Sequence, residues 1–315
     1  MSGTCTSIDW DQISTAHERI APHIRRTPVM DLDGSAFGLS HPVALKLELL
    51  QHTGSFKPRG AFNNLLSRDV PPAGVVAASG GNHGAAVGYA AHRLGHPARI
   101  YVPRIAGPAK IALIRETGAD LHVTEGDYSQ ALAAAQAHEA TTGAIQVHAY
   151  DAPETVIGQG TVALEWEEQG LDADTVLIAV GGGGLIAGAL AWLGGRRKVV
   201  AVEPEACPTL NRALADGPET EVAVGGIAVN ALGARRIGKI CYGLAHAQGI
   251  HSVLVSDDAI AEAQRLLWRG LRILTEPGGA AALAALTSGA YRPEPGERVA
   301  VLICGGNPAP DPLQG

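Results

Sequence analysis

The stretch Glu-Leu-Leu-Gln-His-Thr-Gly-Ser-Phe-Lys-Pro-Arg-Gly-Ala, residues 48–61, holds one lysine among small and turn-forming residues. Lys57 follows a strand-like run, Val43 to Leu49, and precedes Pro58, which is typical of the first turn of a helix. The glycines let a ligand approach the backbone closely, and Phe56 is placed to shield the amine from water. Because desolvation lowers the pKa of a lysine, the stretch predicts a reactive neutral amine. An ordinary exposed lysine in a loop is the competing interpretation.

The composition limits the class of protein. The chain has 315 residues, of which 46% are hydrophobic but only 4% aromatic, so Ala, Val, Leu and Ile must fill the core around 40 glycines. A net charge of −7, without a long basic run, argues against a nucleic-acid surface. The cysteines are widely spaced, at Cys5, Cys207, Cys241 and Cys304. They form no metal-ligand pattern, and without a secretory signal they predict reduced thiols in a cytoplasmic protein.

One stretch of the sequence has features of a membrane-spanning helix. Residues 176–195 carry no charge and are followed by Arg196 and Arg197. Four consecutive glycines in the middle of the stretch make a poor spanning helix. A buried strand, a loop and a buried helix explain the run better, so no membrane partner is expected.

The order of the patterns predicts the architecture. After Pro71 and Pro72, strand-like runs alternate with helix-like runs, which is the signature of parallel sheets covered by helices. A first series spans residues 75–148 and a second begins near Asp151, whereas residues 204–249 show no clear pattern. Two α/β lobes with a cleft between them are therefore expected.

Two glycine-rich turns each follow a predicted strand and open a predicted helix. In Ser-Gly-Gly-Asn-His-Gly, residues 79–84, bare amides at a helix N-terminus would bind a carboxylate or a phosphate, and Asn82 adds a donor. The run Gly181 to Gly184 with Leu185 makes a phosphate cradle. The first of them alone is also explained as a tight turn with Asn82 as a helix cap.

The second turn also fits a dinucleotide fingerprint. Gly182, Gly184 and Ala187 satisfy G-x-G-x-x-A, and Glu203 ends the next predicted strand about twenty residues on. An NAD-dependent oxidoreductase that uses residues 181–203 is therefore an alternative of another class. It would leave the lysine stretch and the first turn unexplained.

A fourth motif, Cys304-Gly305-Gly306-Asn307, lies at the carboxyl end of the last predicted strand, where parallel sheets bind ligands. Taken in order, the four motifs resemble the serine/threonine dehydratase family, pyridoxal-phosphate (PLP) enzymes of the tryptophan-synthase-β fold (fold type II) related to serine racemase. The resemblance covers nearly the whole chain, including Gly-Gln-Gly-Thr at 158–161 and Glu-Pro-Gly-Gly-Ala at 276–280.

The resemblance implies a role for each motif. Lys57 would hold the cofactor as a Schiff base and move the substrate's Cα proton, while Phe56 packs beside the ring. Asn82 would bind the ring's phenolic oxygen, and Cys304 would face the pyridine nitrogen, where other members place serine. The other implied contacts are Gly181, Gly182, Gly183, Gly184 and Leu185 for the phosphate, and Ser55, Ser79, Gly80, Gly81, Asn82 and His83 for the substrate.

The same resemblance implies a large PLP-binding domain from residues 1–72 and 150–315, a small mobile domain from residues 73–149, an active site in the cleft, and a homodimer. The implied reaction is β-elimination of water from L-serine or L-threonine, which gives a 2-oxo acid and ammonia. A threo-3-hydroxyaspartate dehydratase and a serine racemase of the same family are the alternatives.

Departures from the family pattern refine these expectations. Gly80 stands where racemases carry a second serine as acid and base, so little racemase activity is expected. Glu203 remains from the carboxylate pair of metal-dependent relatives, but Thr209 replaces its partner. A divalent ion is therefore not expected, whereas a monovalent cation such as K⁺ at Glu203 is a hypothesis. Arg235 or Arg236 would recognise a second carboxylate or brace a dimer.

Overall fold

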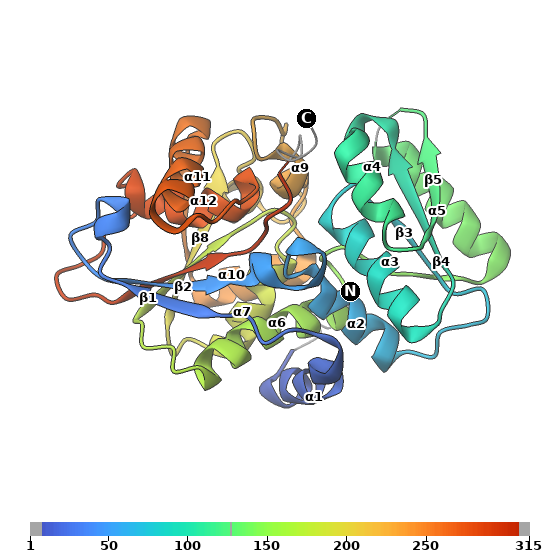
Figure 1. Cartoon of the computed structure of the whole chain (residues 1–315), viewed down its shortest axis with the longest axis horizontal. Coiled ribbons are helices and arrows are strands. Elements are labelled where there is room, and N and C mark those ends of the chain that lie inside the picture. The colour runs from blue at the N-terminus through green and yellow to red at the C-terminus, as the bar shows by residue number, and fades with distance from the viewer. Residues whose placement is uncertain (1–7, 127, 309–315) are drawn as a thin grey trace.

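The computed structural model describes residues 8–126 and 128–308, and it places them in two lobes that are each built on a sheet (Figure 1). The larger lobe has a six-stranded sheet in the order β1-β2-β10-β7-β8-β9, in which only β1 and β2 pair antiparallel. Its strands are β1 (Val29–Leu32), β2 (Val43–Leu47), β7 (Thr175–Ala179), β8 (Lys198–Pro204), β9 (His251–Val255) and β10 (Val299–Ile303). The α/β fold with two parallel-sheet lobes is confirmed, and β1 is an antiparallel addition.

The smaller lobe has a parallel sheet in the order β5-β4-β3-β6. Its strands are β3 (Val75–Ala78), β4 (Ala98–Pro103), β5 (Asp120–Thr124) and β6 (Ile145–Gln146), and its helices are α3 (Asn82–Leu94), α4 (Pro108–Arg115) and α5 (Tyr128–Thr142). The helices of the larger lobe are α1 (Trp10–Ile20), α6 (Pro153–Glu168), α7 (Gly184–Leu193), α8 (Thr209–Asp216), α9 (Val229–Leu232), α10 (Lys239–Gln248), α11 (Asp257–Leu271) and α12 (Pro277–Thr287).

Local sequence explains why several elements begin where they do. Every residue of β7 and β10 is buried, so these strands are continuous apolar runs without alternation. Helix α11 begins after Ser256, whose side chain accepts a hydrogen bond from Ala259 N, and Asp257 and Asp258 favour its first turn. These acidic residues therefore act at a helix start.

Helix α2 (Lys57–Ser67) lies between the two lobes (Figure 1). Its residues Ala61, Phe62 and Leu65 belong to the hydrophobic core of the smaller lobe. Its other face packs on α6, where Gly158 is required because a Cβ there would lie 2.6 Å from the backbone oxygen of Arg59. The division at residues 72 and 150 stays a prediction, and α2 contributes to the core on the other side of it.

A buried ionic network fixes the position of α2. Arg59 donates to both carboxylate oxygens of Glu48, each at 2.8 Å, and to Glu165 at 2.9 Å. Lys46 donates to the other oxygen of Glu165 at 2.6 Å. The four side chains are at most 2% exposed. Because an unpaired buried charge is costly, two cations and two anions must stay together, and they tie β2, α2 and α6 to one another.

The described residues show two further features that bear on the sequence analysis. No helix among them combines the length and the apolar character that crossing a bilayer requires. Cys207, Cys241 and Cys304 are buried free cysteines, whereas Cys5 lies outside the described residues.

Replacement of Arg59 by Met should destabilise the protein strongly. The substitution leaves Glu48 and part of Glu165 buried without their cation, which typically costs about 3–5 kcal/mol of the free energy of unfolding. Urea unfolding followed by circular dichroism measures the effect. Arg26→Met is the matched control, because Arg26 and Glu168 form a pair with side chains 52% and 45% exposed, and we expect a loss below about 1 kcal/mol there. Equal losses in the two variants would contradict the prediction.

Candidate active site

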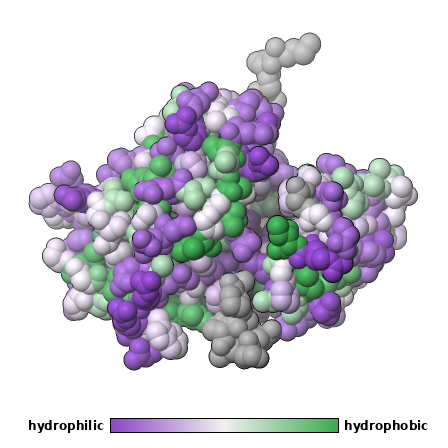
Figure 2. All heavy atoms as spheres, turned by 90° about the horizontal axis from the view of Figure 1, so that it is seen from above, coloured by the Kyte–Doolittle hydropathy of each residue, from purple (hydrophilic) through white to green (hydrophobic). Residues whose placement is uncertain are grey.

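The four sequence motifs meet at the cleft between the lobes. Strands β2, β10 and β7 are parallel neighbours, so the segments after their carboxyl ends lie at one edge of the sheet. The backbone N–H of Phe56 donates to the backbone oxygen of Cys304 at 3.2 Å, and Ser55 forms an isolated bridge with Gly305. The Lys57 stretch and the Cys304 stretch are therefore held side by side at this edge. Seen from above, the surface is hollowed between the lobes, and hydrophobic side chains border the hollow on both sides (Figure 2).

Lys57 is the first residue of α2, and its amine is desolvated. Its Nζ donates to the backbone oxygen of Ala149 at 2.8 Å and lies 5.1 Å from the centre of the Phe56 ring. Burial lowers the pKa of the Lys57 amine to about 8, although Cys304 and Glu276 nearby act in the opposite direction. A substantial neutral fraction is therefore present near neutral pH, as nucleophilic and base chemistry requires.

The tetraglycine turn leads from β7 into α7 and has no space for side chains. A Cβ at Gly182 would overlap the ring of Tyr150, and one at Gly181 would lie 2.9 Å from the Cα of Leu232. Gly183 has a φ of +94°, which favours glycine. Leu185 anchors the first turn of α7 in the core. The turn therefore presents bare amides at a helix N-terminus, which suits a phosphate.

The second anion-binding turn leads from β3 into α3. Ser79 accepts a hydrogen bond from the N–H of Gly81 at 3.2 Å, and α3 begins at Asn82. His83 lies against the backbone oxygen of Val147, with its Nε2 at 2.8 Å, and burial lowers the pKa of this imidazole to about 3. His83 is therefore neutral and donates from Nε2. A Cβ at Gly80 would overlap the Cβ of Ala106.

Asn82 links the smaller lobe to the larger one. Its Nδ2 donates to Glu276, which precedes α12, and its Oδ1 accepts from Asn307 at 2.9 Å. Burial raises the pKa of Glu276 to about 7, while Lys110 and Asn82 act against the rise. The sequence motifs contained Glu276 and Asn307, but motif reasoning gave neither a role.

Cys304 is buried at the end of β10. Its Sγ lies 3.5 Å from the backbone oxygen of Gly278, and burial raises the pKa of the thiol to about 12. The thiol therefore stays protonated and neutral at physiological pH.

The comparisons with known proteins agree with this geometry. The family described as pyridoxal-phosphate dependent enzymes matches residues 20–305. The chain belongs to this family. It is 37% identical over 309 residues to the phenylserine dehydratase of Ralstonia pickettii, covering 96% of this chain and 94% of that one. It is 34% identical to the beta-hydroxyaspartate dehydratase of Paracoccus denitrificans, covering 95% and 96%.

Solved structures of fold type II PLP enzymes have the same fold. Maize serine racemase superposes with a TM-score of 0.89 at 30% identity, covering 96% of this chain and 94% of that one. The threonine deaminase of T.th. superposes with a TM-score of 0.88 at 33% identity, covering 95% and 98%. The predicted family and the predicted cofactor PLP are confirmed, and the NAD interpretation of residues 181–203 has no support from these relatives.

The residues present in this PLP enzyme fit the cofactor. The glycine turn is a cradle that any Cβ would fill, and the reactive amine of Lys57 lies in the same cleft. The buried hydroxyls of Thr53 and Ser55 have no hydrogen-bond partner among the described residues, so polar groups remain available beside Lys57.

Glu203 has a structural role in this fold. Its carboxylate accepts from the N–H groups of Leu210 and Asn211 at 2.6 and 2.7 Å and from Ser252 at 3.2 Å, so it caps the start of α8. Burial raises the pKa of Glu203 to about 7. A carboxylate held in this way is not free to bind a ribose. Residues 8–126 and 128–308 contain no group of three or more His, Cys, Asp or Glu that could hold a metal ion, and the K⁺ hypothesis stays a prediction.

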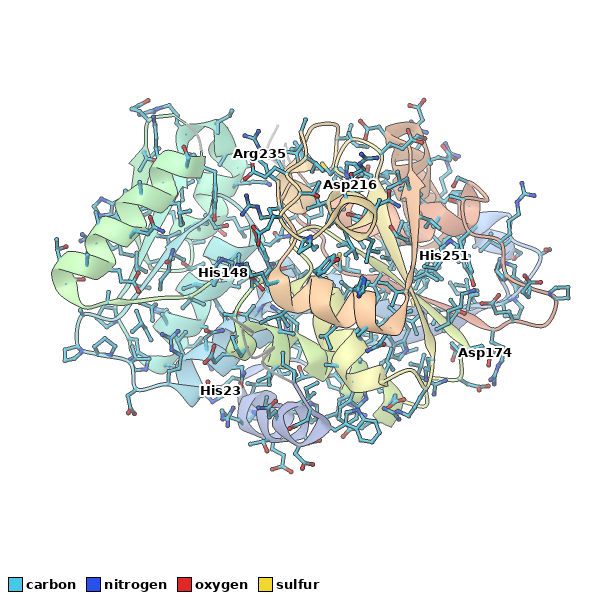
Figure 3. The ribbon with its side chains drawn as sticks, turned by 180° about the vertical axis from the view of Figure 1, so that it is seen from behind. His23, His148, Asp174, Asp216, Arg235 and His251 are labelled. Carbon is cyan, nitrogen blue, oxygen red and sulfur yellow. The ribbon has the colours of Figure 1, made fainter. Side chains whose placement is uncertain are left out.

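The two arginines that follow α9 differ in their surroundings. Arg236 pairs with Glu219 at 2.9 Å and with Glu221 at 2.7 Å, all on the surface. Arg235 and His148 lie at the junction of the lobes (Figure 3). Arg236 is therefore engaged by carboxylates, and a contact of either arginine with a substrate stays a prediction.

The lowered pKa of Lys57 predicts how fast PLP combines with the cofactor-free protein. With a pKa of about 8, roughly a tenth of the amine is neutral at pH 7, whereas under about 0.1% of an ordinary lysine is neutral there. We expect the rate of recombination, followed by stopped-flow absorbance, to rise with pH and to level off near pH 9. A rate that still climbs tenfold per pH unit up to pH 10 would contradict the prediction.

Proposed function

We propose that this PLP enzyme removes water from a β-hydroxy L-amino acid and releases a 2-oxo acid and ammonia. One observation supports the proposal above all: a desolvated lysine amine shares a cleft with a phosphate-sized glycine cradle and a second anion-binding turn. The names of several relatives, which are dehydratases or ammonia-lyases acting on phenylserine, threonine and beta-hydroxyaspartate, support the same reaction class.

Each part of the cleft has a task in this proposal. PLP, when bound, withdraws electrons from the substrate's Cα and so makes its proton acidic. The neutral amine of Lys57 accepts that proton at Nζ. The backbone amides of residues 79–84, that of His83 included, bind the substrate carboxylate, while the neutral imidazole of His83 braces the turn through Val147. Ser55 adds a buried hydroxyl beside the reacting centre.

The substrate that we propose is L-serine or L-threonine. A threo-3-hydroxyaspartate or an aromatic β-hydroxy amino acid is the alternative, which Arg235 or the hydrophobic borders of the cleft would favour. Racemase activity is expected to be low, because Gly80 has no side chain and Ala106 occupies the space where one would extend. A homodimer, a cytoplasmic location and a cation at Glu203 remain parts of the proposal.

A substrate panel tests the proposal. Purified holoenzyme is assayed with L-serine, L-threonine, L-threo-phenylserine and threo-3-hydroxyaspartate for 2-oxo acid, ammonia and the D-isomer. We expect equal amounts of 2-oxo acid and ammonia from at least one of them, little D-isomer, and a loss of at least about 10³-fold in Lys57→Ala, because both the base and the attachment point are removed. Turnover retained in Lys57→Ala would refute the mechanism, and no product from any β-hydroxy amino acid would refute the function.

Cys304 is expected to control the partition of products. Its neutral thiol supplies no counter-charge to the pyridine nitrogen, so less negative charge is delocalised into the ring and elimination is favoured over transamination. Cys304→Asp introduces a carboxylate there and should raise the fraction of turnovers that end in pyridoxamine phosphate. Chromatography of the cofactor after exhaustive turnover measures that fraction. An unchanged fraction would remove this role for the thiol.

A further inference from the structure

Two segments of the larger lobe meet at the side-chain amide of Asn82, and a third holds one of them. Asn307 donates from Nδ2 to Asn82 Oδ1 at 2.9 Å, and Asn82 donates from Nδ2 to Glu276. Asn307 also donates to the backbone oxygen of Thr53 at 2.7 Å. We infer that Asn307 and Glu276 are positioning residues that fix the direction in which Asn82 presents its second N–H to PLP. This inference rests on the proposed contact between Asn82 and the phenolic oxygen of the cofactor.

The hydrogen bonds leave one orientation for each amide. A backbone oxygen can only accept, so Asn307 must turn its NH₂ group toward Thr53, and that same NH₂ group meets Asn82. Asn82 must then offer its oxygen to Asn307 and its NH₂ group to Glu276. If the Asn82 amide were flipped, its NH₂ group would face the NH₂ group of Asn307, and its oxygen would face the carboxylate of Glu276. One N–H of Asn82 remains, and it is the group available to an oxygen of the cofactor.

The backbone around these residues is shaped to bring them together. Thr53 has a φ of +58°, a conformation that is strained for a β-branched residue. A Cβ at Gly54 would overlap Asn307, and a Cβ at Gly305 would overlap the carboxylate of Glu276. Strain and obligatory glycines at such sites are typical of a held functional geometry. The arrangement therefore explains why glycines occupy these positions in the Thr-Gly-Ser-Phe-Lys and Cys-Gly-Gly-Asn motifs.

Asn307→Asp tests the inference directly. Aspartate cannot donate, so it places a carboxylate against Asn82 Oδ1 and turns the NH₂ group of Asn82 away from the cofactor. We expect the dissociation constant of PLP, from equilibrium dialysis of the holoenzyme, to rise about tenfold, as for one lost hydrogen bond to a charged oxygen. The absorption maximum of the bound cofactor should shift as well. A variant that binds PLP with the wild-type dissociation constant would overturn the inference.

A double-mutant cycle separates positioning from general damage. If Asn307 acts through Asn82, then Asn82→Ala and Asn82→Ala/Asn307→Asp should bind PLP equally well, because the positioned group is already gone. If the two effects multiplied, so that the dissociation constant of PLP rose about a hundredfold in the double variant, Asn307 would act independently of Asn82. That result would overturn the inference. Should Asn307→Asp fail to fold, the same cycle with Glu276→Leu decides by the same two outcomes.

Asn63→Asp is the matched control. Asn63 also donates to a backbone oxygen, that of Glu154 at 2.7 Å, and it accepts from Arg19 at 2.7 Å, but it lies on α2 among contacts with α1 and α6. We expect unchanged PLP binding in this variant, and a tenfold loss there would assign the effect of Asn307→Asp to general damage. The double-mutant cycle measures only the affinity for PLP. A holoenzyme that binds PLP but converts no substrate of the panel would therefore refute the proposed function and leave the inference standing.

Discussion

The pairing of Arg59 with Glu48 and Glu165 holds the helix that carries the reactive lysine. Arg59 lies two residues after Lys57 on α2, and its guanidinium binds one carboxylate next to β2 and another on α6. Because all three charges are buried, a displacement of α2 would leave a charge without a partner in a medium of low polarity. The position of Lys57 relative to the sheet is therefore determined by a buried network of charges to which Lys57 itself does not belong.

The pKa values of the two neighbouring cations of α2 are shifted in opposite directions. Burial alone would lower the pKa of Arg59, but Glu48 and Glu165 raise it above its ordinary value. Lys57 has no carboxylate in ion-pair contact among the described residues, so burial prevails and its pKa falls. Helix α2 thus carries a permanent charge, Arg59, that fixes its position. About half a turn earlier it carries an amine, Lys57, that can lose its charge.

Sequence patterns predicted the periodic elements well because their causes are local. The alternation of strands and helices predicted over residues 75–148 is observed from β3 to β6, and α3 for example begins at a glycine-rich turn and ends before Gly95. Between residues 204 and 249 the helices α8, α9 and α10 are short and separated by glycines, so no period develops. The motif residues of the cleft were also recognisable. Long-range pairs were not, because no local signal joins Lys46 to Glu165 or Asn82 to Asn307.

Close packing around Gly80 limits which groups of the site are available for proton transfer. The Gly80 position faces Ala106, and His83 is turned toward the backbone oxygen of Val147 with a low pKa, so this turn offers hydrogen-bond donors but no group that exchanges protons near pH 7. Burial also raises the pKa of Glu276 to about 7, but Asn82 holds its carboxylate, so Lys57 is the group in the described cleft whose pKa and hydrogen bonding suit proton transfer at Cα. A single proton-transferring amine removes and returns protons on its own side of the substrate, whereas racemisation needs a second group across from it. Under the proposed function, packing of small residues in the second anion-binding turn would favour elimination over racemisation as much as the chemistry of the lysine does.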